Sequence, residues 1–401
     1  MVRRSLLAIA TVLFVVVGCV VVSTPASAVV DSATIVSSPS PGPTTNYLSS
    51  VSCLNASSCI AVGETDAGVG NAALVLKWDG VSWTQVASPD LGGFWELHSV
   101  SCVSSMSCTA VGRDNNGFSS SETLATTWDG ESWTRAITPN VGPEANRLES
   151  VSCTSASSCV AVGEYMDAGV SKTLVLVWNG VLWAHAASPN HGVGRNDLAS
   201  VSCATATFCA AVGSYSENGR KTLVLVGNGS TWTEVPSPNP SAGMNRLYGV
   251  SCVSATWCAA VGYTDIDDIE NVVLVWDGST WERVSSPNPS TTENVLNAVS
   301  CASAVSCVAV GNYIDNEFVE RASVLSWDGF VWSVVSSPSP GTVGDTLSSV
   351  SCASEFLCNA VGNSESGSVK DSLALLLTGP EPLPTTTTTV ATDPVAPTFT
   401  G

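Results

Sequence analysis

A segment of about 50 residues recurs seven times along the chain, and this repetition constrains the fold more than any other feature. Each copy contains two cysteines six positions apart and ends in Val-Gly, as in the stretch from Cys153 through Cys159 to Gly163. The first cysteines of consecutive copies lie 49 to 51 residues apart. A fixed period of this length is typical of an array in which each copy forms one supersecondary unit. We therefore expect one repeat domain rather than several unrelated domains.

The paired cysteines predict one disulfide in each copy. Two cysteines separated by five residues can face each other across a hairpin, near the Cα separation that a disulfide accepts. A zinc site would need four converging ligands, and the three histidines do not follow the repeat. Of the 15 cysteines, Cys19 is the one outside the pairs. The expected disulfides are Cys53–Cys59, Cys102–Cys108, Cys153–Cys159, Cys203–Cys209, Cys252–Cys258, Cys301–Cys307 and Cys352–Cys358.

The third copy illustrates the secondary structure expected of each repeat. Residues 148–153, 159–165 and 173–178 alternate or are rich in β-branched residues, which is typical of strands. Asn-Gly at position 179 suits a tight hairpin, because both residues tolerate a positive φ. A fourth strand is expected over residues 183–188, where a proline follows. Four antiparallel strands in each of seven copies predict an all-β fold, a seven-bladed β-propeller.

The ends of the repeat region predict that the ring is closed. The seventh copy stops after its third strand, residues 372–377, and has no fourth strand. The segment 33–42 near the start of the chain instead matches the fourth-strand segment of the sixth copy, residues 332–341. The N-terminal strand is therefore expected to complete the last blade, which removes exposed strand edges. An open solenoid is the alternative, but it would have no reason for such a split.

The N-terminal segment 1–28 is predicted to be a signal peptide. Arg3 and Arg4 precede an apolar run, and small residues at positions 26–28 form a cleavage site. Two alternatives are a lipoprotein anchored through Cys19 and an uncleaved membrane anchor. All three place the body of the protein outside the cytoplasm, where disulfides persist. We expect it to be secreted or associated with the cell wall, with any membrane contact made through an N-terminal anchor.

The propeller is assigned to residues 29–380, and residues 381–401 form a Pro- and Thr-rich tail that is expected to be disordered. The net charge is −20, with only 14 Lys and Arg residues. Nucleic-acid binding needs clustered cations and is therefore not expected.

A turn motif between the third and fourth strands carries a family resemblance. Five copies read Trp-Asp-Gly-x-x-Trp or Trp-Asn-Gly-x-x-Trp, beginning at Trp78, Trp128, Trp178, Trp276 and Trp327. The Trp-Asp pair resembles WD-repeat propellers, and Gly-x-x-Trp partly resembles the Asp-box of sialidase-like propellers. Over residues 33–378 the chain is most similar to Cys-rich secreted propeller-repeat proteins of actinobacteria. That resemblance implies a fold and a location, and no activity. We expect the Asp of the motif to shape the turn and the tryptophans to pack blades together.

Residues that differ between copies are the candidate binding residues. Chain direction places the loops between second and third strands, and the loops between blades, on one face; the tight hairpins lie on the other. Propellers usually bind ligands through such variable loops. Aromatic side chains beside carboxylates and arginines suit a carbohydrate or a peptide. The candidates are Trp95, Arg147, Arg195, Arg246, Tyr165, Tyr215, Tyr313, Asp265, Asp267, Asp268 and Glu270.

The functional prediction is a non-catalytic binding or scaffold propeller that recognises carbohydrate or protein, as a monomeric ring. No catalytic residues, metal ligands or cofactors are predicted, although the acidic loop 265–270 is a conceivable calcium site. The alternative is a glycan-active hydrolase or lyase of the sialidase-like type, suggested by the partial Asp-box and the arginines. A third hypothesis is a purely structural envelope protein.

Overall fold

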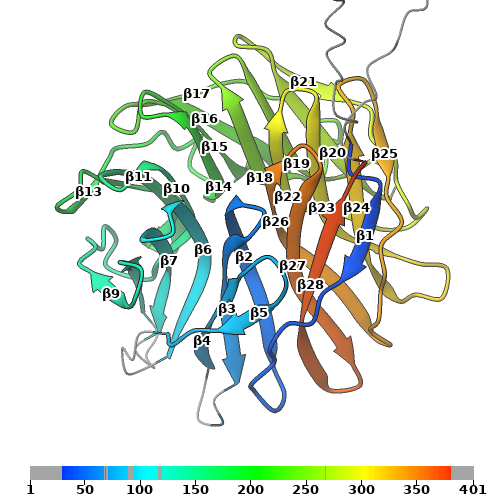
Figure 1. Ribbon diagram of the computed structural model, residues 1–401. Coiled ribbons are helices and arrows are strands. Elements are labelled where there is room, and N and C mark those ends of the chain that lie inside the picture. Colours follow the sequence, from blue (N-terminus) through cyan, green and yellow to red (C-terminus); the bar gives the residue numbers. More distant parts are fainter. Residues whose placement is uncertain are drawn as a thin grey trace, which may run out of the picture.

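The computed structural model describes residues 29–66, 68, 71–88, 94–115, 120–266 and 268–380. Within these residues the regular secondary structure consists of β-strands, arranged as blades of four around a common centre (Figure 1). None of the described residues belongs to a helix long and apolar enough to cross a membrane. The predicted signal peptide with Cys19, the predicted disordered tail and Asp267 lie outside the described residues.

The third blade shows how the sequence pattern becomes a sheet. It consists of β10 (Asn146–Ser155), β11 (Ser158–Asp167), β12 (Val170–Trp178) and β13 (Trp183–His185), paired in that order. The first three strands are longer than predicted, because β11 and β12 continue to a two-residue turn at Ala168 and Gly169, both with positive φ. The fourth strand is shorter than predicted and ends at His185.

The other blades repeat this arrangement. Blade 1 contains β2 (Asn46–Asn55), β3 (Ser58–Asp66), β4 (Asn71–Trp78) and β5 (Trp83–Gln85), and blade 2 contains β6 (Phe94–Ser104), β7 (Ser107–Asn115), β8 (Ser121–Trp128) and β9 (Trp133–Ala136). Blade 4 contains β14 (Asn196–Thr205), β15 (Phe208–Ser216), β16 (Arg220–Gly227) and β17 (Trp232–Glu234). Blade 5 contains β18 (Asn245–Ser254), β19 (Trp257–Asp265), β20 (Ile269–Trp276) and β21 (Trp281–Val284). Blade 6 contains β22 (Asn294–Ser303), β23 (Ser306–Ile314), β24 (Glu320–Trp327) and β25 (Trp332–Val334).

The seventh blade draws its strands from both ends of the chain. β26 (Gly344–Ser354), β27 (Leu357–Ser366) and β28 (Val369–Thr378) are followed in the sheet by β1 (Ser32–Ile35). β1 is antiparallel to β28, with Ser32 opposite Thr378 and Ile35 opposite Leu375. The strand from the start of the chain thus occupies the fourth-strand position of the last blade.

The hydrophobic core lies between neighbouring blades. Leu48 and Leu74 of blade 1 pack against Val361 and Ala374 of blade 7, and equivalent clusters lie between the other blades. These side chains are at most 1% exposed. Each buried Leu contributes roughly 2 kcal/mol through removal of apolar surface from water. A blade therefore depends on its neighbours for its stability.

The serines of the repeat link the first strands of adjacent blades, which we call the inner strands. Val151 N and Cys153 N donate to Ser99 Oγ and Ser101 Oγ of the preceding blade, at 3.1 and 3.0 Å. This pattern recurs around the molecule, except where Gly249 and Ala298 replace the first serine. The recurrence of Ser-x-Ser-Cys therefore has a structural cause beyond the disulfide.

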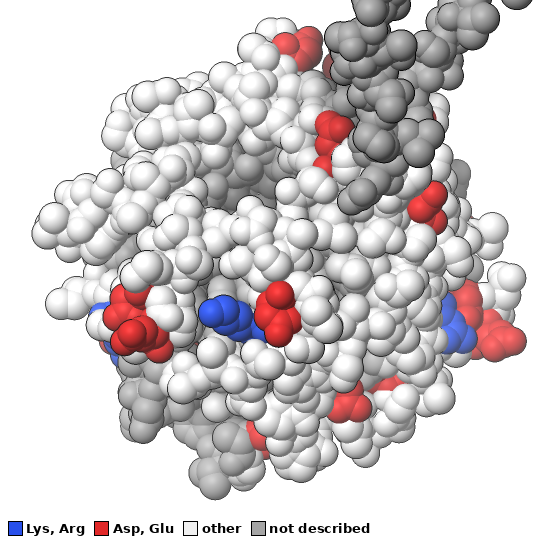
Figure 2. Space-filling view, in the orientation of Figure 1, with Lys and Arg blue, Asp and Glu red and all other residues white. Residues whose placement is uncertain are grey.

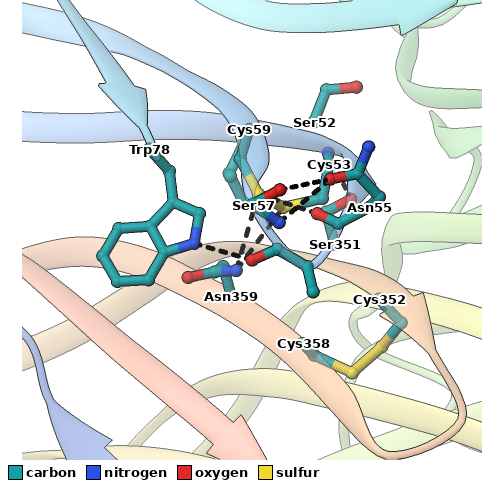
Figure 3. The surroundings of a disulfide bond; sticks show 12 residues. Ser52, Cys53, Asn55, Ser57, Cys59, Trp78, Ser351, Cys352, Cys358 and Asn359 are labelled. Atoms are coloured by element: carbon teal, nitrogen blue, oxygen red, sulfur yellow. Dashed lines mark hydrogen bonds between the residues drawn. A yellow bond between two sulfur atoms is a disulfide. The ribbon is translucent and has the colours of Figure 1, made fainter. Parts of the chain in front are cut away.

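Blade 1 contacts blade 7 in the same way as consecutive blades contact each other. Val51 N donates to Ser349 Oγ at 3.2 Å. Cys53 N donates to Ser351 Oγ at 2.9 Å, and both of these residues are labelled in Figure 3.

All seven predicted disulfides are present, one in each blade. The two cysteines of each pair face each other across the first hairpin of the blade, with Cα atoms 3.9 to 4.0 Å apart. Figure 3 shows the Cys53–Cys59 bridge beside Asn359 of blade 7, whose Nδ2 lies 3.5 Å from Cys59 Sγ. The bridges pin the ends of the inner strands on the hairpin face.

The Trp-Asp-Gly motif is structural. Asp79 Oδ1 accepts hydrogen bonds from Val81 N and Ser82 N, both at 2.8 Å, and so shapes the turn. Trp78 and Trp83 pack together with ring centroids 5.4 Å apart, and both belong to the core between blades 7 and 1. Trp83 is only 4% exposed, so its ring offers no surface for stacking a sugar.

Candidate functional site

Each inner strand carries one unpaired residue that faces the centre of the molecule. The register of every first strand pair shifts by one residue after a conserved leucine position, for example between Leu148 and Ser150. Such a bulge leaves one residue outside the ladder and re-aims its side chain. A cavity of about 150 Å³ is lined by residues of all seven blades, these bulge residues among them. The seven bulge residues are Ser49, His98, Glu149, Ala199, Tyr248, Asn297 and Ser348.

A second set of varied residues lies two positions before each bulge, closer to the loop face. We call them the mouth residues. Each faces a residue of the second strand, as Glu96 faces Arg113 and Arg147 faces Glu164. The mouth residues of blades 1 to 7 are Tyr47, Glu96, Arg147, Asp197, Arg246, Val295 and Thr346.

Ion pairs join the mouth and bulge residues of blades 2 and 3. Glu96 accepts two hydrogen bonds from Arg113, through Nε and Nη2, both at 2.9 Å. His98 lies between two carboxylates: Nε2 is 3.3 Å from Glu96 Oε2, and Nδ1 is 3.2 Å from Glu149 Oε2. Glu149 Oε1 is in turn 2.8 Å from Arg147 Nε. Because Glu149 belongs to blade 3, this imidazole bridges two blades.

The pairs continue through blades 4 and 5. Glu164 lies between Arg147, at 2.6 Å, and Arg195, at 3.2 Å. Asp197 likewise lies between Arg195 Nε, at 3.7 Å, and Arg246 Nη2, at 3.0 Å. The result is a charge chain that alternates in sign. Its members are Arg113, Glu96, His98, Glu149, Arg147, Glu164, Arg195, Asp197 and Arg246, in that order.

The contacts within the charge chain set the protonation states of His98 and of the two carboxylates beside it. Burial alone would lower the pKa of His98, but hydrogen bonds to Glu149 and Glu96, together with their charges, raise it to about 9. Burial would raise the pKa of Glu96 and of Glu149, and the hydrogen bond and charge of His98, with help from the neighbouring arginines, lower both to about 2. His98 is therefore an imidazolium at neutral pH, with both ring nitrogens protonated.

In blade 1, next to the charge chain, burial raises the pKa values of two side chains. Burial, followed by the charge of Glu96, raises the pKa of Glu64. Burial, followed by the charges of Glu64 and Glu96, also raises the pKa of Tyr47. Glu64 is 7% exposed, so this edge of the mouth disfavours additional negative charge.

Blades 6 and 7 have uncharged side chains at their mouth and bulge positions. The mouth residues are Val295 and Thr346, and the bulge residues are Asn297 and Ser348. Asn297 Nδ2 donates to Leu347 O at 3.0 Å, which links the two blades without an ion pair.

The structure brings together the three arginines that the sequence singles out. Arg147, Arg195 and Arg246 all belong to the charge chain, where Glu164 and Asp197 separate them. Arg195 comes from the loop before β14, which explains why it is one residue out of register with the other two.

The predicted tyrosines lie further from the centre. Tyr165, Tyr215 and Tyr313 each face the asparagine that begins the inner strand of their blade. The Tyr215 ring packs on His191, with centroids 4.1 Å apart. None of the three is a member of the charge chain, and Tyr165 and Tyr215 pack against the cores between blades.

Trp95 is only 5% exposed and belongs to the core between blades 1 and 2, so it does not present its ring to a ligand. Five other blades have a buried asparagine at this position, such as Asn146, whose Oδ1 accepts from Gly142 N at 3.0 Å and holds the loop, and blade 7 has the buried Asp345. Trp95 fills this buried position in blade 2.

The predicted acidic loop is partly engaged in its own structure. Asp265 Oδ1 accepts from Ser241 Oγ at 2.6 Å and from Met244 N at 2.5 Å, and the bond to Ser241 lowers the pKa of Asp265. Glu270 lies 3.4 Å from Arg283 Nη2, and Asp268 is exposed. The part of the chain that the structure describes holds no group of three or more His, Cys, Asp or Glu placed to bind a metal ion.

The carboxylates and the histidine of the charge chain were not among the predicted residues. A signal for them exists, since Glu96, Arg147, Asp197 and Arg246 occupy equivalent positions of consecutive copies and alternate in sign. By contrast, Figure 2 shows that on the side in view charged side chains are scattered and mostly acidic, over a largely uncharged surface. The central charge chain is thus the densest arrangement of cations described above.

Comparisons with known proteins identify the fold. No protein-family model and no curated protein sequence matches the chain. Among solved structures, YCF48 bound to D1 peptide aligns over 89% of this chain and 100% of its own, with a TM-score of 0.55 and 13% identity. YCF48 from Cyanidioschyzon merolae aligns over 86% and 98%, with a TM-score of 0.55 and 15% identity. The WD40 β-propeller domain of Doa1 aligns over 86% and 95%, with a TM-score of 0.52 and 11% identity. At these identities the likeness shows a β-propeller fold.

Proposed function

We propose that the chain is a secreted, non-catalytic binding propeller that takes protein or peptide ligands at the mouth of its central cavity. The observation that carries the proposal is the charge chain. It is built from positions at which the seven copies differ, whereas the rest of each inner strand is nearly uniform. Arginines and carboxylates held in fixed geometry suit the recognition of charged and hydrogen-bonding groups of a polypeptide. A structural neighbour that was solved bound to a peptide supports the same ligand class.

We further infer that the seven blades form a closed ring. The pairing of β1 with β28 and the serine hydrogen bonds between blades 7 and 1 support closure. A closed ring holds the mouth residues of non-adjacent blades at fixed distances, which preorganises a binding site.

Export is part of the proposal. Seven disulfides are typical of an oxidising, extracellular environment. The first 28 residues would act as the signal peptide. Asp31 N donates to Thr378 O at 3.0 Å, so the two ends of the described chain lie together on the hairpin face. A tether at either end would leave the mouth pointing away from the anchoring surface.

The alternative of a sialidase-like hydrolase is less well supported. Such chemistry needs arginines that are available to hold a substrate. Arg147 and Arg195 are each held by two carboxylates of the protein, which already neutralise them. Turnover of a sialoside or polysaccharide by the purified protein would favour the hydrolase over the binding module.

The test is binding to peptide and glycan arrays by the purified protein. We expect saturable binding to a subset of peptides. Ala199→Arg, which fills the cavity, should weaken it at least tenfold, whereas Thr256→Arg, on an exposed hairpin tip of the opposite face, should leave it unchanged. Silence on the peptide array, or equal loss in both variants, would contradict the proposal. Binding confined to the glycan array would show that the ligand is a carbohydrate and not a polypeptide.

A further inference from the structure

The charge chain is incomplete at one end. It contains five cations and four carboxylates within the described residues, so one cation has no carboxylate of its own. At the first end, Arg113 is held by two hydrogen bonds to Glu96. At the other end, Arg246 donates a single hydrogen bond, from Nη2 to Asp197. Its Nε is buried and has no acceptor among the described residues.

The next blade is where the alternation would place an acid. The mouth residues of blades 2 to 5 read Glu96, Arg147, Asp197 and Arg246, and Val295 of blade 6 follows them. Val295 faces Asn312, so neither strand supplies a charge there. Neither the mouth residue of blade 6 nor the residue that faces it therefore places a carboxylate next to Arg246.

Arg246 is also held ready for a partner. Its Cζ lies 4.8 Å from the centroid of the Tyr248 ring, which packs against Tyr263 at 5.8 Å. This contact and the bond to Asp197 fix the guanidinium in place. The side chain remains 19% exposed. A fixed guanidinium with unused donors is suited to binding a carboxylate through two parallel hydrogen bonds.

We propose that Arg246, at the open end of the charge chain between blades 5 and 6, binds a carboxylate group of the ligand. The carboxylate of a peptide C-terminus or of an acidic side chain would become the tenth charge and complete the alternation. The inference rests on the proposed function, because it names the ligand group that the mouth recognises. The four existing partners in the chain are all carboxylates, so we assign a carboxylate rather than a phosphate.

The test follows the Arg246 Nε–Hε NMR signal in the full chain labelled with ¹⁵N-arginine, assigned by its loss in Arg246→Lys. N-acetylglycine should shift this signal in a saturable manner, and the neutral N-acetylglycinamide should not. Val295→Glu should abolish the shift, because the new side chain takes the tenth position itself. Val295→Gln, of the same size but uncharged, should retain it.

Absence of a shift with N-acetylglycine would overturn the inference, as would equal shifts with both compounds. A shift with inorganic phosphate alone, or an unchanged response in Val295→Glu, would also overturn it. This result is separable from that of the arrays. Peptide binding that Val295→Glu leaves intact would refute the carboxylate site and leave the binding propeller standing. A shift with N-acetylglycine but no binding on the peptide array would support the carboxylate site and refute the peptide-binding propeller.

Discussion

The two ends of each inner strand follow different rules. At the hairpin end, Val-Ser-Cys is identical in all seven blades and is fixed by a disulfide and by a hydrogen bond that the serine Oγ accepts from the cysteine N–H of the next blade. At the mouth end, only a few residues earlier, the seven copies carry aromatic, acidic, basic, amide, hydroxyl and aliphatic side chains. One strand thus holds scaffold at one end and candidate recognition residues at the other.

Geometry explains this division. The N–H of the first cysteine at the hairpin end donates to the serine of the neighbouring blade that precedes its own first cysteine, and every copy has a serine at that position. The bulge then turns the next varied side chain toward the cavity, where no repeat contact constrains it. The predictions below disturb first one end and then the other.

The largest effect is expected from reduction of all seven disulfides. Each bridge closes a short loop and contributes about 2 kcal/mol by the chain-entropy estimate. Their sum is comparable with the whole stability of a domain, about 5–15 kcal/mol. We expect the reduced protein to unfold at ambient temperature, as followed by near-UV circular dichroism. A reduced protein that retains its signal and melts within a few degrees of the oxidised form would show that the bridges are not essential to the scaffold.

A smaller change in stability is expected at the other end of the inner strand, where the charge of His98 makes the free energy of unfolding depend on pH. Its pKa is near 6.5 when unfolded and about 9 when folded, so the stabilisation is complete below pH 6.5 and is lost as pH rises through 9. The free energy of unfolding should fall by roughly 3 kcal/mol over that range. His98→Ser should be less stable at pH 6 and lack this slope, whereas exposed His185→Ser should keep it. A slope unchanged in His98→Ser would contradict the assignment.

The loss of stability at low pH comes from the carboxylates beside His98. The pKa values of Glu96 and Glu149 are about 2 when folded, against 4.5 for the free side chain. Their contribution is present above pH 4.5 and is lost as pH falls through 2. The stability of this part of the molecule should therefore be greatest between about pH 4.5 and 6.5.

The smallest expected change in stability comes from substitutions at the hairpin end of the inner strands. Ala298→Ser should restore the serine that blade 6 lacks, so that its Oγ accepts from Val350 N as Ser349 Oγ accepts from Val51 N. We expect a gain of about 0.5–1 kcal/mol in chemical denaturation. Gly249→Ser, the matched change in blade 5, should instead destabilise, because a Cβ there would lie 2.9 Å from Ala298 Cα. Equal effects of the two changes would argue against the serine hydrogen bonds as the cause.

The sequence predicts the scaffold better than the site because the scaffold depends on local signals. Cysteine spacing and the glycine turns fix the hairpins, and the match between residues 33–42 and 332–341 anticipates the pairing of β1 with β28. The disulfides were predicted correctly for the same reason.

The site depends on a feature that no local pattern reveals. The bulge changes which side chains face the cavity, and it brings His98 of blade 2 beside Glu149 of blade 3, 51 residues away in sequence. The arginines were identified by their equivalent positions, but their carboxylate partners were not. Trp95 was selected for its type, although it fills a buried position that asparagine or aspartate holds in the other blades.

The most direct test compares two aromatic side chains, one in the central cavity and one on the hairpin face. Tyr248 lines the cavity, and Phe330, which is 85% exposed, lies in the turn between β24 and β25 on the hairpin face. The affinity for an array-selected peptide would be measured by isothermal titration calorimetry for Tyr248→Ala and Phe330→Ala. We expect at least a tenfold loss for Tyr248→Ala and less than a twofold change for Phe330→Ala. A loss confined to Phe330→Ala would place recognition on the hairpin face and contradict the division of each inner strand into scaffold and site.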